Sequence, residues 1–313
     1  MADLVQVDAL RHQYGSRVAL DGVSFAVTGG ECFALLGPNG GGKTTLFRIL
    51  TTLLTPSGGT ARICSCDVRT DRPAARRRIG VVFQSPSLDI YLTVRENLRH
   101  AGHLYGMSGR ELERRIVELL GRLGLAGRED DLVKTLSGGQ RRRAEIAKGL
   151  LHEPALLILD EPSTGLDPVA RRELWQMLQE LRQSTGVTIL LTTHFMEEAE
   201  RCDQLAILDR GRLVACGSPA QLKGRLGGDC ITIQCDDPAA LRERAARELG
   251  VEAAVVDGMV RIETADGPAV MARLMATFAA ETKAITLGRP TLEDVFVHET
   301  GRRFDTEVAA DAA

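Results

Sequence analysis

The chain has 313 residues, of which 44% are apolar and 26% charged, and its formal net charge is −3. This balance is typical of a globular protein with a sizeable core. It excludes a strongly basic surface, so we expect no nucleic-acid partner, and the arginine clusters at residues 76–78 and 141–143 are interpreted as solvated helix faces. No window approaches the roughly eighteen apolar residues that span a bilayer. The length predicts one large domain and one small one.

The N-terminal stretch and the cysteines indicate the compartment. Residues 1–5 lack a basic segment followed by an apolar one, so no secretion signal is expected and the cytoplasm is the default location. Seven cysteines without C-x-x-C spacing are typical of reduced, packed thiols. Cys64 and Cys66 suggest either a metal site or two residues on one strand face. Because no second Cys/His pair lies nearby, the strand interpretation is favoured.

The chain begins with two segments of alternating polarity, Leu4–Ala9 and Val18–Val27. They predict antiparallel strands joined near Tyr14 and Gly15. An aromatic ring at this place can stack on an adenine, and it can equally pack at a hairpin corner. Both interpretations of Tyr14 stay open at this point.

The next segment contains the pattern G-x-x-x-x-G-K-[ST]. A predicted buried strand, Cys32–Leu36, precedes it, and a predicted amphipathic helix, Leu46–Leu54, follows it. In this setting backbone N–H groups and the helix dipole hold phosphates, Lys43 adds a positive charge at the β and γ oxygens, and Thr44 can bind Mg²⁺. The alternative is a glycine-rich turn without a binding role. Such a turn would require neither the Lys-Thr pair nor the flanking strand and helix, so the phosphate-binding interpretation is favoured. The loop consists of Gly37, Pro38, Asn39, Gly40, Gly41, Gly42, Lys43, Thr44 and Thr45.

Polar residues follow two further predicted strands. Gln84 comes after Ile79–Phe83, and Asp160 and Glu161 come after the apolar run Ala155–Leu159. In an open parallel sheet the ligand lies at the carboxyl ends of the strands. One acid can there hold Mg²⁺ through water while the other orients or deprotonates the attacking water. Gln84 can reach the ion or the water, although an amide before Ser-Pro-Ser also fits a simple loop residue.

A third strand, predicted over Val187–Thr193, ends at His194. At that edge of the sheet the imidazole is placed to contact a γ-phosphate. A tight turn is expected between these strands, from Ser163 to Asp167.

Between the strands, Thr93–Leu132 has a helical pattern, and we predict a capping box that opens a helix at residues 108–111. Its apolar stripe is interpreted as intramolecular core. Leu136–Gln140 then precedes a predicted helix over Arg141–Leu151. Small residues at a helix N-terminus form an anion site, and since the first loop already holds one nucleotide, this second site calls for another ligand or another subunit's nucleotide.

Taken in order, these motifs resemble the ATP-binding cassette subunits of ABC transporters, over Leu4 to about Lys223. The resemblance implies an α/β P-loop NTPase fold with a mixed sheet core, an antiparallel β subdomain and a helical subdomain at about residues 93–150. Leu136–Gln140 is similar to the family signature, which closes over the nucleotide of a second subunit. Gly41 stands where the family often has Ala or Ser, which adds backbone freedom without removing a contact.

The family's roles transfer residue by residue. Glu161 is expected to be the catalytic base, assisted by His194 as the switch histidine and by Gln84. The expected Mg²⁺ ligands are Thr44, Gln84 and, through water, Asp160. Expected ATP contacts are Tyr14, loop residues 37–45 and, across a dimer, Ser137, Gly138, Gly139, Gln140 and Asp167.

The sequence pattern of the C-terminal part predicts a second domain. Residues 227–288 alternate as βαββαβ, the ferredoxin-like order, with both helices on one sheet face and a hairpin turn at Asp257 and Gly258. The block 289–296 and the residues after His194 resemble the drug- and antibiotic-exporter branch. Glu293, Asp294 and Phe296 are expected to contact the cassette or its partner.

The whole pattern predicts a cassette at residues 1–223, a regulatory or dimerisation domain at 224–301 and a disordered tail at 302–313. We expect an ATPase that dimerises with a second copy around two ATP, with Mg²⁺, and drives separately encoded transmembrane permease subunits from the cytoplasmic face of the membrane. The alternatives are a soluble cassette ATPase that is not coupled to transport and a cassette gated by a small ligand at its second domain.

Overall fold

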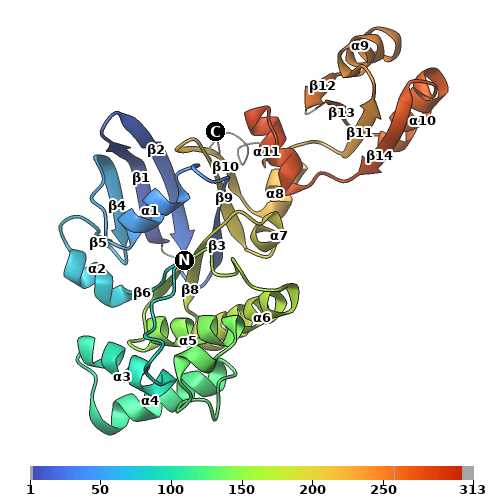
Figure 1. Cartoon of the computed structure of the whole chain (residues 1–313). Helices are drawn as coiled ribbons and strands as arrows, with labels where there is room; N and C mark the ends of the chain where they lie inside the picture. Colours follow the sequence, from blue (N-terminus) through green and yellow to red (C-terminus); the bar gives the residue numbers. More distant parts are fainter. Residues whose placement is uncertain (1–2, 257, 305–313) are drawn as a thin grey trace. The chain divides into compact units, whose positions relative to one another are not determined.

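The computed structural model describes residues 3–256 and 258–304 (Figure 1). The chain divides into two compact units, with the boundary between Leu213 and Val214. The predicted tail beyond residue 304 and Asp257 of the predicted hairpin turn lie outside the described residues. No helix within those described ranges is both long and apolar enough to cross a membrane.

The first unit is built on a six-stranded sheet with the order β10-β9-β3-β8-β7-β6. β3 pairs in parallel with β8 and β9, and β7 pairs in parallel with β6 and β8. Every residue of β3, β7 and β8 is buried, as expected for strands covered on both faces. The carboxyl ends of β3, β6, β7 and β8 therefore share one edge. The strands are β3 (Cys32–Leu36), β6 (Ile79–Val82), β7 (Leu156–Asp160), β8 (Thr188–Thr193), β9 (Gln204–Asp209) and β10 (Arg212–Gly217).

A second, antiparallel sheet has the order β2-β1-β4-β5, from β1 (Asp3–Tyr14), β2 (Arg17–Thr28), β4 (Gly58–Ile63) and β5 (Cys66–Asp67). The predicted hairpin of β1 and β2 is confirmed, with longer strands than expected. The expectation that Cys64 and Cys66 share a strand face is wrong. Ile63 pairs with Cys66, so Cys64 lies in the tight turn between β4 and β5, at a φ of 49°.

The helical segment packs as three helices, α3 (Val94–Leu104), α4 (Gly109–Arg122) and α5 (Gly138–Leu150), which lie together in Figure 1. The predicted capping box at the start of α4 is wrong. The Ser108 side chain makes no capping hydrogen bond, and Gly109 has a left-handed φ of 64°, which turns the chain away from the capping geometry. Capping boxes instead open α3, at Thr93 and Glu96, and α5.

The remaining helices of this unit connect the strands. The predicted helix after the glycine-rich loop begins earlier and ends earlier than expected, since Gly42 is its N-cap and Thr51 its C-cap. These helices are α1 (Lys43–Leu50), α2 (Arg72–Arg78), α6 (Pro168–Thr185) and α7 (Met196–Ala199).

The second unit has the βαββαβ order that the sequence predicts, in an antiparallel sheet ordered β12-β13-β11-β14. Side chains of β11 and β13 form a core with α9 and α10, so both helices cover one sheet face. The elements are α8 (Pro219–Gly224), β11 (Asp229–Cys235), α9 (Pro238–Arg244) continued by a π-helical turn (Ala245–Leu249), β12 (Ala253–Val256), β13 (Met259–Thr264), α10 (Gly267–Phe278), β14 (Thr282–Gly288) and α11 (Leu292–Thr300).

The closing helix α11 overturns one expectation. Phe296, expected to contact the cassette or its partner, is not free to anchor a partner, because it is fully buried within its own chain, where its ring meets the edge of Phe304 at 5.0 Å between centroids. Asp294 is also used internally, because its Oδ1 lies 2.6 Å from Nη1 of the buried Arg261. The aromatic ring and this acid therefore hold the second unit together.

Candidate active site

Close backbone packing explains why the phosphate loop is rich in glycine. A Cβ atom on Gly37 would lie 2.4 Å from the carbonyl oxygen of Leu208 in β9. Gly42 has a φ of 106°, and a Cβ there would lie 2.9 Å from the carbonyl oxygen of Ala19 in β2. At Gly41 the corresponding distance to the carbonyl oxygen of Pro38 is 3.0 Å, so a side chain needs only a small shift. The loop is thus wedged between β9 of the six-stranded sheet and β2 of the antiparallel sheet.

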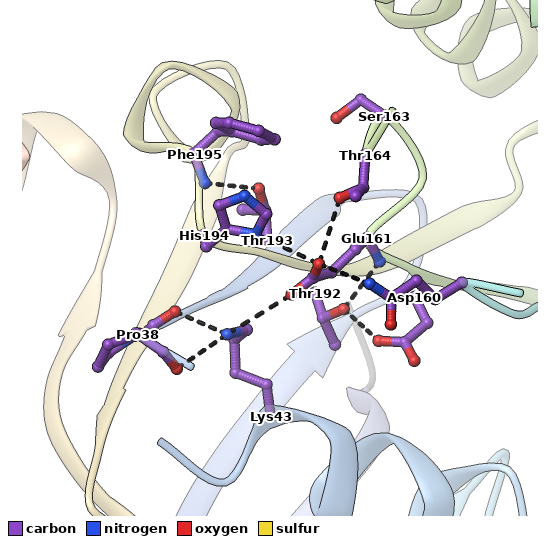
Figure 2. A network of polar contacts seen from close by, with 12 residues as sticks. Pro38, Lys43, Asp160, Glu161, Ser163, Thr164, Thr192, Thr193, His194 and Phe195 are labelled. Carbon is purple, nitrogen blue, oxygen red and sulfur yellow. Dashed lines mark hydrogen bonds and ion pairs between the residues drawn. The ribbon is translucent and has the colours of Figure 1, made fainter. Parts of the chain in front are cut away.

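Lys43 is buried at the start of α1 and points toward the end of β7 (Figure 2). Its Nζ donates to the carbonyl oxygens of Gly37 at 2.7 Å and Pro38 at 3.0 Å, and lies 3.7 Å from Oε1 of Glu161. Burial lowers the pKa of the ammonium group, while the Glu161 and Asp160 carboxylates act in the opposite direction. The hydrogen bonds to Gly37 and Pro38 and the contact with Glu161 hold the lysine Nζ between the loop and the end of β7.

Four side chains converge on the carboxylate of Glu161. Besides Lys43, the Nε2 atom of Gln84 donates to Oε2 at 3.2 Å, and the Thr164 hydroxyl donates to the same oxygen at 3.2 Å. Nδ1 of His194 also lies 3.2 Å from Oε2, but without hydrogen-bond geometry, so this contact is electrostatic when the ring is protonated. Residues that follow β6, β7 and β8, together with Lys43 of the phosphate loop, therefore all contact the Glu161 carboxylate. Figure 2 shows this for the residues that follow β7 and β8.

The backbone of Glu161 is strained. Its φ of 44° is left-handed, which costs a residue with a Cβ roughly 1–2 kcal/mol. Its N–H is held by Thr192 of β8, with the carbonyl oxygen at 3.2 Å and Oγ1 at 3.0 Å. Strain of this kind gathers at functional sites, where the surrounding structure fixes an otherwise unfavourable conformation.

The neighbouring Asp160 is buried and accepts a hydrogen bond of 2.6 Å from Oγ1 of Thr192. Burial raises the pKa of its carboxyl group. Asp160, Gln84 and Thr44 all line one cavity of about 330 Å³ beside the loop. These are oxygen donors, the ligand type that Mg²⁺ prefers, and Mg²⁺ sites typically use only one or two protein groups with water and phosphate oxygens. The residues thus fit an open magnesium site, although the described residues contain no closed cluster of three or more His, Cys, Asp or Glu.

The signature segment lies apart from this cluster. Ser137 and Gln140 form a reciprocal capping box at the start of α5, with hydrogen bonds of 3.0 and 3.2 Å to each other. A Cβ on Gly139 would lie 3.3 Å from the Cβ of Ala170, and one on Gly138 3.7 Å from the Leu166 side chain. The signature glycines therefore pack against the turn after β7 and the start of α6.

Two predicted ATP contacts also stand outside the cluster. Asp167 is the N-cap of α6, and hydrogen bonds from the N–H groups of Ala170 and Val169 lower the pKa of its exposed carboxyl. Tyr14 is 44% exposed at the hairpin end of β1, with its ring edge-on to His12. On the same hairpin, Arg17 approaches the loop at Gly40.

Sequence reasoning missed the contacts that hold Gln84. Arg142, expected on a solvated face, is buried and donates from Nη1 to the Phe83 carbonyl oxygen at 2.7 Å and to Oε2 of Glu145 at 2.8 Å. The other oxygen of Glu145 accepts from the Ser87 N–H at 2.8 Å. The sequence holds only a weak signal for this pair, an Arg and a Glu three positions apart on one helix.

These features define the site of a nucleoside-triphosphate hydrolase: a glycine-rich loop before a helix, a buried lysine, and two acids at the end of an apolar strand. Comparison with known proteins identifies the family of hydrolases to which the chain belongs. The family described as ABC transporter matches residues 20–164. A second family, described as AAA domain, putative AbiEii toxin, Type IV TA system, matches residues 134–197.

Two curated relatives align over nearly the whole chain. The Nod factor export ATP-binding protein I of Ralstonia nicotianae is 42% identical over 308 residues, which cover 96% of this chain and 94% of the relative. The daunorubicin/doxorubicin resistance ATP-binding protein DrrA of Streptomyces peucetius is 38% identical over 318 residues, which cover 99% of this chain and 96% of the relative.

A solved structure agrees with these relatives. The cbiO1 protein from Clostridium perfringens, described as part of the ABC transporter complex cbiONQ, matches 79% of this chain and 96% of its own, with a TM-score of 0.67 and 29% identity. The chain therefore belongs to the family of ATP-binding subunits of ABC transporters. It is an ATP-hydrolysing subunit of the exporter type, with the cassette fold predicted from its motifs.

Proposed function

We propose that this subunit binds ATP between two copies of itself and uses its hydrolysis to drive separate transmembrane subunits. The observation that carries the hydrolytic part is the convergence of Lys43, Gln84 and His194 on the Glu161 carboxylate. In this proposal Lys43 and loop residues 37–45 bind the phosphates, and Tyr14 stacks on the adenine. Glu161 takes a proton from the attacking water, which makes it the general base.

The other members of the site orient these groups. Gln84 and His194 both approach Oε2 of Glu161, which supports a role in fixing its rotamer. In this proposal His194 also contacts the γ-phosphate. Thr44, Gln84 and, through water, Asp160 would hold Mg²⁺, which neutralises phosphate charge when bound. The carboxylate is thus oriented by its own chain before any substrate group contributes.

Glu161→Gln tests this assignment. The amide is nearly isosteric with the carboxylate but cannot accept the water's proton, so ATP affinity should persist while turnover falls by about 10²-fold or more. Steady-state hydrolysis and ATP binding are measured on the same protein. Near-normal hydrolysis by the variant would remove Glu161 from the role of base.

The placement of the signature supports the proposed dimer. Within the described residues, Ser137 and Gln140 hydrogen-bond to each other at the start of α5 and to nothing in the phosphate loop. A helix N-terminus with two small residues is an anion site, and it is available to a γ-phosphate carried by a second copy. Ser137, Gly138, Gly139 and Gln140 would then contact the partner's ATP, and Asp167 would line the interface.

The membrane partner is proposed from the relatives, two of which are named for export or drug resistance and one of which is part of a transporter complex. Separate permease subunits would hold this chain peripherally at the cytoplasmic face of the membrane. Co-purification of the chain with a coexpressed membrane protein encoded beside it tests this. Failure of the chain to co-purify with that membrane protein would favour the soluble alternative.

For the second unit, residues 224–301, we propose a ferredoxin-like domain that serves dimerisation or regulation. The strand order and the single face covered by α9 and α10 support the fold. A cavity of about 260 Å³ on the other sheet face, lined in part by Thr232, Arg261 and Val297, favours a small ligand as the second candidate. Charge reversal at the exposed Glu293, measured by the ATP-dependent dimer dissociation constant, tests the dimerisation role, and an unchanged constant contradicts it.

A further inference from the structure

The first unit contains a buried carboxyl group that has no role in the site described so far. Glu198, in α7, is 2% exposed, and both of its carboxyl oxygens accept hydrogen bonds. The hydroxyl of Thr193 donates to Oε2 at 2.7 Å, and the hydroxyl of Ser163 donates to Oε1. Both hydroxyl-bearing residues are buried as well. Within the described part of the chain, Glu198 forms no ion pair, so these two hydroxyls satisfy it.

One of these donors belongs to the turn that follows the general base. Ser163 is two residues beyond Glu161, and the turn is closed by the Thr164 N–H on the Glu161 carbonyl oxygen at 3.2 Å and by the Leu166 N–H on the Ser163 carbonyl oxygen at 3.1 Å. Holding Ser163 therefore holds the turn that leaves Glu161.

The other donor stands directly before the switch histidine. Thr193 is the last residue of β8, and its Oγ1 also accepts from the Phe195 N–H at 2.9 Å, across His194 (Figure 2). The Thr193 hydroxyl thus fixes the backbone on both sides of the imidazole. These contacts close a ring. The backbone links Glu161 to Ser163 and Thr193 to His194, and Glu198 joins Ser163 to Thr193 through hydrogen bonds. The 3.2 Å contact between His194 and Glu161 completes the ring.

We propose that Glu198 is a positioning residue for ATP hydrolysis, which holds His194 against Glu161 by binding Ser163 and Thr193. This inference rests on the proposed roles of Glu161 and His194. Glu198 itself is placed outside the reaction, because its carboxyl group faces two buried hydroxyls rather than the cavity beside the loop. Small displacements of a catalytic pair are costly, since a shift of about 1 Å can reduce a rate by about 10²-fold.

The test compares Glu198→Ala and Glu198→Gln with Glu197→Gln, a matched control because Glu197 is the exposed neighbour on the same helix. Glu198→Ala should lower kcat by about ten- to a hundred-fold and leave the dissociation constant for ATP within about two-fold. Glu198→Gln should recover most of kcat, because its amide oxygen accepts from one hydroxyl and its NH₂ donates to the other. Glu197→Gln should match the unsubstituted protein.

Two further variants keep the test decisive if Glu198→Ala does not fold. Ser163→Ala and Thr193→Val each remove one of the two hydrogen bonds to the Glu198 carboxyl group and leave the other hydrogen bond in place. Each should lower kcat while ATP affinity persists, and combining the two should give less than the product of the separate effects, because both act through Glu198. A lower melting temperature with unchanged kcat in these variants would make Glu198 purely structural and overturn the proposal. Hydrolysis by Glu161→Gln would instead refute the proposed base, whatever the Glu198 variants do.

Discussion

The guanidinium group of Arg142, on the signature helix, donates to the main-chain carbonyl oxygen of Gln84 at 3.3 Å. Gln84 in turn donates its side-chain amide to Glu161, the proposed general base, at 3.2 Å. The helix that begins at the signature is therefore connected to the hydrolytic carboxylate through one glutamine. A shift of α5 relative to β6 would therefore act first on the backbone of Gln84.

This connection predicts a large loss of stability in Arg142→Met. The substitution leaves the buried Glu145 without its cation, and breaking a buried pair typically costs about 3–5 kcal/mol. Arg143→Met is the matched control, because the adjacent arginine pairs with the 57% exposed side chain of Glu173, a contact of about 0–1 kcal/mol. Urea unfolding measures both free energies. Equal losses in the two variants would show that burial of the Arg142 pair has no energetic consequence.

The phosphate loop predicts an asymmetry between two of its glycines. Gly37→Ala forces a Cβ to within 2.4 Å of a backbone oxygen, which cannot move without distorting β9, so ATP affinity should fall by at least about ten-fold. Gly41→Ala places its Cβ 3.0 Å from the Pro38 carbonyl oxygen and 3.1 Å from that of Leu208, which requires shifts of only a few tenths of an ångström, so ATP affinity should stay within about three-fold of the original protein. A binding titration on both variants decides the matter. Equal affinities would contradict the proposed wedging of the loop.

The sequence predicted the parts of the site that depend on local pattern. Each polar residue at a strand end, Gln84, Asp160, Glu161 and His194, could be placed because an apolar strand precedes it and parallel strands share an edge. The same periodicities predicted β3, β6, β7 and β8 of the six-stranded sheet, the hairpin of β1 and β2 and the order of elements in the second unit, whereas β9 and β10 were not predicted.

What the sequence could not show are contacts between residues far apart in the chain. Arg142 looks like its neighbours in a run of arginines, and only the packing of α5 against β6 makes it a buried donor. Glu198 lies in an acidic stretch, and its hydroxyl partner Ser163 is 35 positions away. The hairpin turn at Cys64 escaped prediction because its left-handed backbone is occupied by residues other than glycine.

The signature segment predicts a charge-sensitive dimer interface. Ser137 is a helix N-cap, so its replacement must preserve the cap, and Asp and Asn both do so as well as Ser. In a Glu161→Gln background, Ser137→Asp places a carboxylate where the partner's γ-phosphate is expected, and ATP should no longer drive dimerisation. Ser137→Asn, the neutral control, should still dimerise. Sedimentation with ATP distinguishes the two, and dimerisation of the Asp variant would show that the signature faces no partner phosphate.

The last prediction concerns the second unit, where the burial of Phe296 changes what its removal should do. A fully buried aromatic that packs on Phe304 contributes to the core of its own chain, so Phe296→Ala should destabilise the second unit by about 3–5 kcal/mol. Glu293→Ala, on the same helix but with a side chain 49% exposed, should change stability by less than about 0.5 kcal/mol.

Denaturant unfolding of the full chain measures both variants, and ATP binding reports separately on the cassette. Because the phosphate loop and its carboxylates belong to the first unit, ATP affinity should stay unchanged in both variants. Small and equal stability changes in the two variants, accompanied by a weaker ATP-driven dimer in Phe296→Ala alone, would return Phe296 to the role of an intermolecular anchor.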